Sequence, residues 1–319
     1  MIDELILRNF RGFGSLELKG LKPVNLIVGH NNTGKTSLLE GIVLLCEPPK
    51  VGQLVGLFRP IQGSPKSRFY RWLLKDGSKQ AYLKRGSGDS FYEFVLRHPS
   101  VKNEDPLPGP GWVHLQNCQD VFIFANTQGP QNSIMRCRIV SVQHMDPNSL
   151  VSLIGKAHRK KKGEETLQRL LSKIDPRISK IRIDPGEDGN QVIVDIGLSE
   201  LLPITQVGQG AYRLASILAD IIGEETDVLL IDEIENGLHH SVMEQVWTGL
   251  AETAAELKVQ IFATTHSGEC LLAAHKAFEK RSAYDLAVIQ LFRNEKGVQG
   301  RVLDKEHIEA AVAADIELR

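Results

Sequence analysis

The sequence predicts an α/β protein, and three observations lead to that prediction. Apolar runs bounded by turn residues alternate with segments of helical spacing at both ends of the 319-residue chain. One apolar run, Val24–Val28, leads into a glycine-rich loop and a helical segment, as a strand buried on both faces would. A second, Val228–Ile231, ends in two carboxylates. Between them, short strand patterns and loops rich in Pro and Gly predict an inserted α+β region.

The first half begins with two short strands, Ile2–Leu7 and Ser15–Leu18, on either side of the turn Gly12-Phe13-Gly14. This pattern predicts an antiparallel β-subdomain at the N-terminus. After the strand Val24–Val28, a helix over Thr36–Cys46 is expected to stop before Pro48.

The rest of the chain supplies further strand and helix patterns. We divide the chain into a single domain, 1–319, with parts 1–50, 51–202 and 203–319. Strands are expected at Gln80–Lys84, Phe91–Leu96, Val121–Phe124, Ile139–Val142, Lys180–Ile183, Val192–Ile196, Val228–Ile231, Val259–Ala263 and Ala287–Phe292, and helices at Glu164–Lys173, Gln209–Ile222, Ser241–Leu257 and from Lys305.

The composition excludes several classes of protein. Hydrophobic residues make up 42% and charged residues 24%, which excludes a disordered or fibrous chain. No apolar run approaches the length of a membrane span, and the first residues lack the basic region of a signal peptide. The four cysteines lie far apart, which argues against a zinc site or a disulfide framework. We expect a reduced, cytoplasmic protein with no membrane partner.

Charge is segregated along the chain although the net charge is only −1. Arg59–Arg85 holds eight basic residues and one acid, and Lys156–Arg182 holds ten basic residues and three acids. Ile217–Glu256 holds ten acids and no Lys or Arg. The basic runs either form a face for a polyanion such as DNA or are solvated and partner-docking surfaces.

The most specific motif is the run from Gly29 to Thr36, which fits G-x-x-x-x-G-K-[ST] at every fixed position. Its glycines let the backbone N–H groups curl around phosphate oxygens. Lys35 would place its ammonium near the β- and γ-phosphates, and the Thr36 hydroxyl would bind Mg²⁺. The residues expected to line this nucleotide site are Gly29, His30, Asn31, Asn32, Thr33, Gly34, Lys35 and Thr36.

The strand Val228–Ile231 delivers Asp232 and Glu233 at its carboxyl end, where ligands bind in open α/β sheets. Asp232 would hold Mg²⁺, and Glu233 would act as general base toward the attacking water. Taken alone, the two acids could equally begin a helix, because Asp is a favoured N-cap.

Two further motifs accompany this pair. His266 follows the strand Val259–Ala263, from which it could reach the γ-phosphate and the attacking water. Gly208-Gln209-Gly210 opens a helix that carries Arg213, and the first N–H groups of a helix suit an anion. A structural histidine and an ordinary turn are the alternatives.

The order of the segments LILRNFRGF, GHNNTGKTS, VGQGAYRL, VLLIDEIENGLHH and FATTHS resembles the ABC-type ATPase heads of the SMC/RecF/OLD group. Within that group the chain looks most like the stand-alone AAA-family ATPases related to OLD nucleases. The resemblance covers roughly 1–47 and 203–310, and it implies a P-loop NTPase fold of ABC type that hydrolyses ATP with Mg²⁺.

The resemblance also implies roles for individual residues. Two heads would sandwich two ATP molecules, so that hydrolysis would require a homodimer or a higher homo-oligomer. Gly208, Gln209 and Gly210 would contact the γ-phosphate bound by the opposite subunit, with Arg213 a further candidate there. Ser37 joins the P-loop, Glu235–His239 forms the D-loop, His266 is the switch histidine, and Gln143 is expected to be the Q-loop glutamine.

Three departures from the family pattern limit the function. The signature reads Gly-Gln-Gly, which argues against a transporter ATPase, and no heptad arm suggests an SMC tether. Only 53 residues follow His266, fewer than the Toprim nuclease domain of OLD proteins needs, so a nuclease would be a separate polypeptide.

Three functions remain open from the sequence. The first is an ATPase that controls DNA processing or anti-phage defence together with a separate effector. The second is a nucleotide-gated scaffold or sensor with little turnover. The third is a RecF-like recombination or repair mediator that binds DNA directly.

Overall fold

The computed structural model describes residues 1–47, 73–98, 113–118, 121–128, 135–140, 147–186, 189–295 and 297–313. The chain forms two compact units. Unit 1 is Met1–Cys137 with Ala287–Arg319, and unit 2 is Arg138–Leu286. The sequence-based middle part, 51–202, therefore contributes to both units, and the assignment of 1–319 to one ATPase domain stays a prediction.

Unit 1 contains a six-stranded antiparallel sheet of order β2-β1-β4-β5-β7-β6. Leu7 lies opposite Leu16 on one side and Leu83 on the other, and all three are buried, so alternate positions of the strands form an apolar row. The sequence predicted the N-terminal antiparallel pair but no strand at β6. The strands are β1 (Glu4–Phe10), β2 (Phe13–Lys19), β4 (Gln80–Ser87), β5 (Ser90–Arg97), β6 (Val113–Cys118) and β7 (Val121–Gln128).

The P-loop helix α1 (Lys35–Cys46) packs against this sheet at Gly41, where a Cβ would come within 3.1 Å of the Leu7 side chain. Unit 1 also holds strands in the order β15-β14-β3, with β14 and β15 antiparallel. The strand β15 was not expected from the sequence. The bounds are β3 (Val24–Val28), β14 (Leu286–Asn294), β15 (Gly297–Leu303) and the helix α10 (Lys305–Ala313).

Unit 2 is built on the parallel strands β12 (Val228–Ile231) and β13 (Gln260–Thr264), with β8 (Cys137–Val140) beside β12. Every residue of β12 and β13 is buried, which explains the apolar runs Val228–Ile231 and Ile261–Ala263. The carboxyl ends of parallel strands meet at one edge of a sheet, so β12 and β13 bring the segments after Ile231 and Thr264 together.

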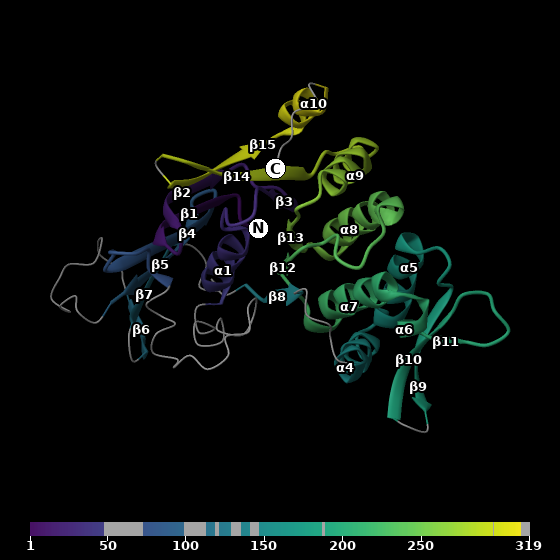
Figure 1. Ribbon diagram of the computed structural model, residues 1–319. Helices are drawn as coiled ribbons and strands as arrows, with labels where there is room; N and C mark the ends of the chain where they lie inside the picture. Colours follow the sequence, from purple (N-terminus) through teal and green to yellow (C-terminus); the bar gives the residue numbers. More distant parts are fainter. Residues whose placement is uncertain are drawn as a thin grey trace. The chain divides into compact units, whose positions relative to one another are not determined.

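Helices cover this core, as Figure 1 shows for α7, α8 and α9. Helix α7 packs on α4 and α5, and α8 packs on α5 and α9. A small antiparallel sheet of order β11-β10-β9 completes the unit. The sequence did not predict α4. The bounds are α4 (Pro147–His158), α5 (Gly163–Ile174), β9 (Lys180–Gly186), β10 (Gly189–Asp195), β11 (Leu202–Pro203), α6 (Ile204–Val207), α7 (Gln209–Glu224), the 3₁₀ helix η2 (His240–Val242), α8 (Met243–Leu257) and α9 (Gly268–Glu279).

The second basic run and the acidic run of the sequence meet in unit 2. Four basic side chains from α4, α5 and the turn between them pair with acids on or just after α7 and on α8. We call this set the ion-pair seam. Its pairs are Lys156–Glu224, Lys160–Glu225, Arg169–Glu256 and Lys173–Glu252. This part of the basic run is therefore neutralised within the protein itself, which weakens the polyanion interpretation for it.

Among the residues that the structure describes, no helix has the length and apolar character needed to cross a bilayer.

Candidate functional site

The P-loop of unit 1 follows β3 and has the backbone shape that its glycines predict. Gly29, Asn32 and Gly34 have φ angles of 151°, 64° and 92°. Residues with a side chain rarely adopt positive φ angles, which explains the glycines at positions 29 and 34. Asn tolerates the left-handed region better than most other residues that have a side chain, which fits Asn32. The Thr33 hydroxyl donates to the carbonyl oxygen of His30 at 2.8 Å, which closes the turn.

Lys35 begins α1 and turns its side chain back into the loop. Its ammonium is buried and donates to the carbonyl oxygens of Gly29 at 2.6 Å and His30 at 3.1 Å. Thr36 and Ser37 are partly exposed in the first turn of the helix, whereas His30, Asn31 and Asn32 are exposed along the loop. The first N–H groups of α1 and the Lys35 charge together make this end of the helix suited to phosphate.

Residues at the turn between β1 and β2 contact the P-loop and α1. A Cβ on Gly34 would lie 3.0 Å from the Phe13 ring, so the loop and the ring are in close contact. Arg11 forms a two-pronged ion pair with Glu40 of α1, with nitrogen–oxygen distances of 2.8 and 2.9 Å. The sequence resemblance had included Phe10-Arg11 without a contact for either residue.

In unit 2, Asp232 and Glu233 come directly after β12 and are held by Thr264 at the end of β13. The Thr264 hydroxyl donates to Asp232 Oδ1 at 2.7 Å and accepts from the backbone N–H of Glu233 at 2.8 Å. Thr264 is fully buried. Glu233 has a φ of 49°. The next residue, Ile234, donates its backbone N–H to the Thr264 carbonyl oxygen at 3.0 Å, so Thr264 holds the chain on both sides of the Glu233 carbonyl.

His266 faces Glu233 from the neighbouring loop. Its Nε2 lies 3.7 Å from Glu233 Oε1, and the two side chains are 37% and 41% exposed, so both are open to solvent. The backbone N–H of His266 donates to Glu235 Oε1 at 2.7 Å. The structure thus brings Asp232, Glu233 and His266 together at one edge of unit 2.

The Gly208-Gln209-Gly210 segment lies at the start of α7, next to the D-loop. Gly208 has a φ of 138°, and a Cβ on Gly210 would come within 2.8 Å of the Leu238 side chain and 3.1 Å of the Gly237 carbonyl. Both glycines are therefore required by the local backbone. A cavity of about 560 Å³ opens here, lined by all three residues, by the D-loop and by Asp175-Pro176-Arg177.

Arg213, one turn further along α7, has its contacts within its own unit. Its guanidinium donates to the carbonyl oxygens of Asn236 at 2.6 Å and Asp232 at 2.8 Å. Burial lowers the pKa of Arg213, while the carboxylates of Glu235, Glu233 and Asp232 act to raise it. These bonds lie within unit 2, and the trans role that the sequence suggested for Arg213 stays a prediction.

Gln143, the expected Q-loop glutamine, lies outside the described residues, as does most of the basic run Arg59–Arg85. The sequence reasoning did not single out Thr264 or assign Glu235 a contact, although both lie inside motifs that it used. The signal for Thr264 was a hydroxyl at the end of an otherwise apolar strand.

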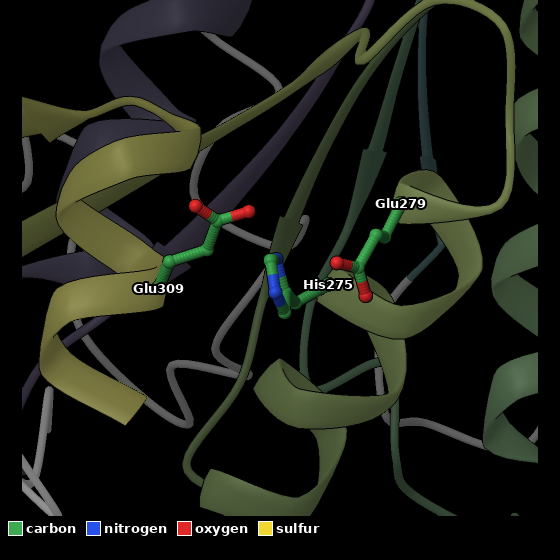
Figure 2. Close-up of side chains that lie close together, drawn as sticks. All are labelled: His275, Glu279 and Glu309. Carbon is green, nitrogen blue, oxygen red and sulfur yellow. The ribbon is translucent and has the colours of Figure 1, made fainter. Parts of the chain in front are cut away.

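Figure 2 shows three further ionisable side chains. His275 and Glu279 lie four residues apart on α9, and His275 Nδ1 is 2.9 Å from the Tyr284 hydroxyl. Glu309 is on α10 of unit 1. The nucleotide chemistry considered below involves none of them.

The P-loop, the acidic pair after β12 and the histidine after β13 define the class of the protein as a P-loop nucleotide hydrolase. Comparisons with known proteins agree. The family described as "AAA ATPase domain" matches residues 1–62, and the family described as "AAA domain, putative AbiEii toxin, Type IV TA system" matches residues 127–272.

Individual proteins give the same class. An "ATP/GTP phosphatase" of Helicobacter pylori (strain ATCC 700392 / 26695) is 21% identical over 370 residues, which cover 97% of each chain. The "DNA replication and repair protein RecF" of Actinobacillus pleuropneumoniae serotype 5b (strain L20) is 52% identical over 44 residues, which are 14% of this chain and 12% of that protein.

Solved structures show the fold. A "SmcHead bound to the C-winged helix domain of ScpA" has a TM-score of 0.60 at 14% identity, covering 97% of this chain and 99% of that one. The "SMC head domain from Thermotoga maritima" has a TM-score of 0.52 at 12% identity, covering 95% and 98%. The chain is an ATP-hydrolysing enzyme with the fold of an ABC-type ATPase head of the SMC/RecF group.

Proposed function

We propose that the chain hydrolyses Mg²⁺-ATP with Glu233 as general base and His266 beside it. The observation that carries the proposal is the pairing of a partly exposed Glu233 with His266, above an Asp232 whose carboxylate is fixed by Thr264. A base must be held in place yet reach water, and the bonded backbone N–H of Glu233 and its partly exposed side chain support this role. Asp232 would be a ligand of the metal and would not compete with Glu233 for the proton.

The residues of unit 1 supply the binding half of this chemistry. The N–H groups at the start of α1 and the Lys35 ammonium would bind the β- and γ-phosphates. Thr36 would offer a hydroxyl oxygen and Asp232 a carboxylate oxygen, and both are ligand types that Mg²⁺ prefers. Bound Mg²⁺ neutralises charge that develops on the phosphate oxygens. Glu233 would take a proton from water, and His266 would orient that water.

We further propose that hydrolysis occurs in a head-to-tail dimer of this chain. Gly208, Gln209 and Gly210 line a cavity that also borders the D-loop, with α7 pointing its N-terminal N–H groups toward it. Such a site could receive the γ-phosphate held by a second copy. The SMC head bound to a ScpA domain is a relative in fold that binds a separate protein, which supports a separate effector here.

The test of the catalytic assignment compares two variants. Lys35→Ala should lose nucleotide binding. Glu233→Gln should keep binding, lower kcat by about 10²–10⁴-fold as expected for a lost base, and accumulate the dimer on ATP. Lys258→Ala and Glu252→Gln serve as matched controls because both residues lie away from these motifs. Wild-type turnover by Glu233→Gln would refute the assignment.

The test of the dimer and of a role on DNA is ATP turnover as a function of protein concentration, with and without duplex DNA. A specific rate that rises with concentration supports catalysis across a dimer. Stimulation by DNA supports control of DNA processing or defence with an effector such as a nuclease. ATP binding with negligible turnover under all conditions would favour a nucleotide-gated scaffold.

A RecF-like repair mediator is the second candidate, favoured by the 52% identity over 44 residues of RecF. That function predicts strong DNA binding by the protein alone that weakens steeply with salt, because phosphate contacts release counterions. Binding that is weak at low salt would exclude it.

A further inference from the structure

Glu235 follows the acidic pair by two positions, and its side chain bonds to the loop of His266. Its Oε1 accepts the backbone N–H of His266 at 2.7 Å. That loop lies between the end of β13 at Thr264 and the start of α9 at Gly268. The His266 N–H therefore falls outside both elements, and a side chain supplies the acceptor that a strand or helix would otherwise give.

The bond from Glu235 holds the backbone of His266, whose ring faces the proposed base Glu233. The distance of 3.7 Å between His266 Nε2 and Glu233 Oε1 is too long for a direct hydrogen bond, so that pair does not hold the ring by itself. The position of the His266 backbone must come from its other contacts. A charge-assisted bond of 2.7 Å to a carboxylate is among the stronger contacts a backbone N–H can make.

The other oxygen of Glu235 is oriented into the protein. Oε2 is buried and has no hydrogen-bond partner among the described residues. A buried carboxylate oxygen in this condition is costly unless a positive charge is near. The guanidinium of Arg213 lies near this stretch of chain, because it donates to the carbonyl oxygen of Asn236, the residue after Glu235, at 2.6 Å.

We propose that Glu235 is a positioning residue that sets His266 against Glu233. The inference rests on the proposed function of Glu233 and His266. It adds a physical connection, within unit 2, between the D-loop and the switch histidine.

The experiment measures kcat and KM for ATP in Glu235→Ala, Glu235→Gln and Glu252→Ala. Glu235→Ala should lower kcat about tenfold or more, a part of what a positioned base contributes, with KM changed less than about twofold. Glu235→Gln should recover to within about threefold of wild type, because its amide oxygen can accept the same N–H. Glu252→Ala, which removes an exposed carboxylate of the ion-pair seam, should match wild type.

The same change is then made in a His266→Ala background. If Glu235 acts through His266, Glu235→Ala should lower kcat less than about twofold further, since the two effects are not independent. A full multiplicative loss there, or wild-type kcat in the single variant, overturns the inference. A Glu235→Ala protein that fails to fold leaves the Gln variant decisive, because inactive but folded Glu235→Gln also overturns it.

Glu233→Gln is measured alongside to separate the two proposals. If Glu233→Gln keeps wild-type turnover, the proposed function fails and this inference fails with it. If Glu233→Gln is inactive while Glu235→Ala turns over normally, the proposed function stands and only the role of Glu235 is lost.

Discussion

The guanidinium of Arg213 donates to the backbone carbonyl of Asp232 at 2.8 Å, so the signature helix is bonded directly to the end of the strand that carries the acidic pair. A second bond, to the carbonyl of Asn236, extends this contact into the D-loop. Two carbonyls held by one planar group fix both the distance and the angle between α7 and the loop after β12.

This relationship predicts that Arg213→Ala lowers ATP turnover about tenfold, because the loop after β12 loses two hydrogen bonds to α7. Arg213→Lys should be intermediate, since an ammonium lacks the planar fork that spans both carbonyls. Steady-state kinetics at saturating protein concentration checks the effect. A mixing experiment with Lys35→Ala protein tests cis action, since rescue of Arg213→Ala by the second copy would show that Arg213 works in trans.

Thr264 predicts a hydroxyl-dependent effect. Thr264→Val keeps the volume but removes the donor to Asp232 and the acceptor for the Glu233 N–H, so both catalytic candidates lose their fixed position. We expect kcat to fall at least about tenfold and the Mg²⁺ requirement to rise. Thr264→Ser keeps the hydroxyl and should retain most activity. Equal activity of the Val and Ser variants would contradict the assigned role.

Gly29 predicts a backbone effect on nucleotide binding. At a φ of 151°, a Cβ at this position would lie 2.4 Å from the Leu291 carbonyl oxygen, a distance that only a backbone shift can relieve. Gly29→Ala should therefore weaken ATP binding and lower the melting temperature. Gly12→Ala is the control, since a Cβ there meets nothing within 4 Å. Calorimetric ATP titration and thermal melts check both variants, and unchanged binding in Gly29→Ala would contradict the loop geometry.

The ion pair of Asp175 with Arg177 should make part of the folding stability depend on acidic pH. The Arg177 side chain, helped by its backbone N–H, lowers the pKa of Asp175 from its ordinary value of 3.8. A lowered folded-state pKa adds stability that is present above 3.8 and lost as the pH falls through the folded value. The unfolding free energies of wild type and Asp175→Asn should therefore converge as the pH falls below the ordinary pKa of 3.8. Urea titrations across this range measure the difference, and a constant gap would contradict the prediction.

The fold class that the sequence predicted is confirmed, whereas the site residues stay predictions that come from contiguous motifs. The P-loop and the acidic pair are contiguous motifs, so Lys35, Asp232 and Glu233 could be assigned without knowing any long-range contact. Thr264 and Glu235 act on residues about 31 positions away, and their partners depend on how β12 and β13 align. That register is fixed by the packing of both strands, which one sequence does not show.

Two of the elements that the sequence did not predict, α4 and β15, were missed for different physical reasons. Helix α4 does carry buried residues at helical spacing, Leu150, Leu153, Ile154 and Ala157, but it lies between loops in the least regular part of the chain. Strand β15 is interrupted by Gly300, which weakens a strand pattern. In the structure that glycine is required, because a Cβ there would come within 2.6 Å of Leu16.

The ion-pair seam has a consequence for synthesis of the chain on the ribosome. The basic partners on α4, α5 and the turn between them precede their acids by 65 to 87 residues. At about 5–20 residues per second, the basic segment waits on the order of 3–17 s for its carboxylates to emerge. During that interval the four basic side chains lack the carboxylates with which they pair in the folded protein.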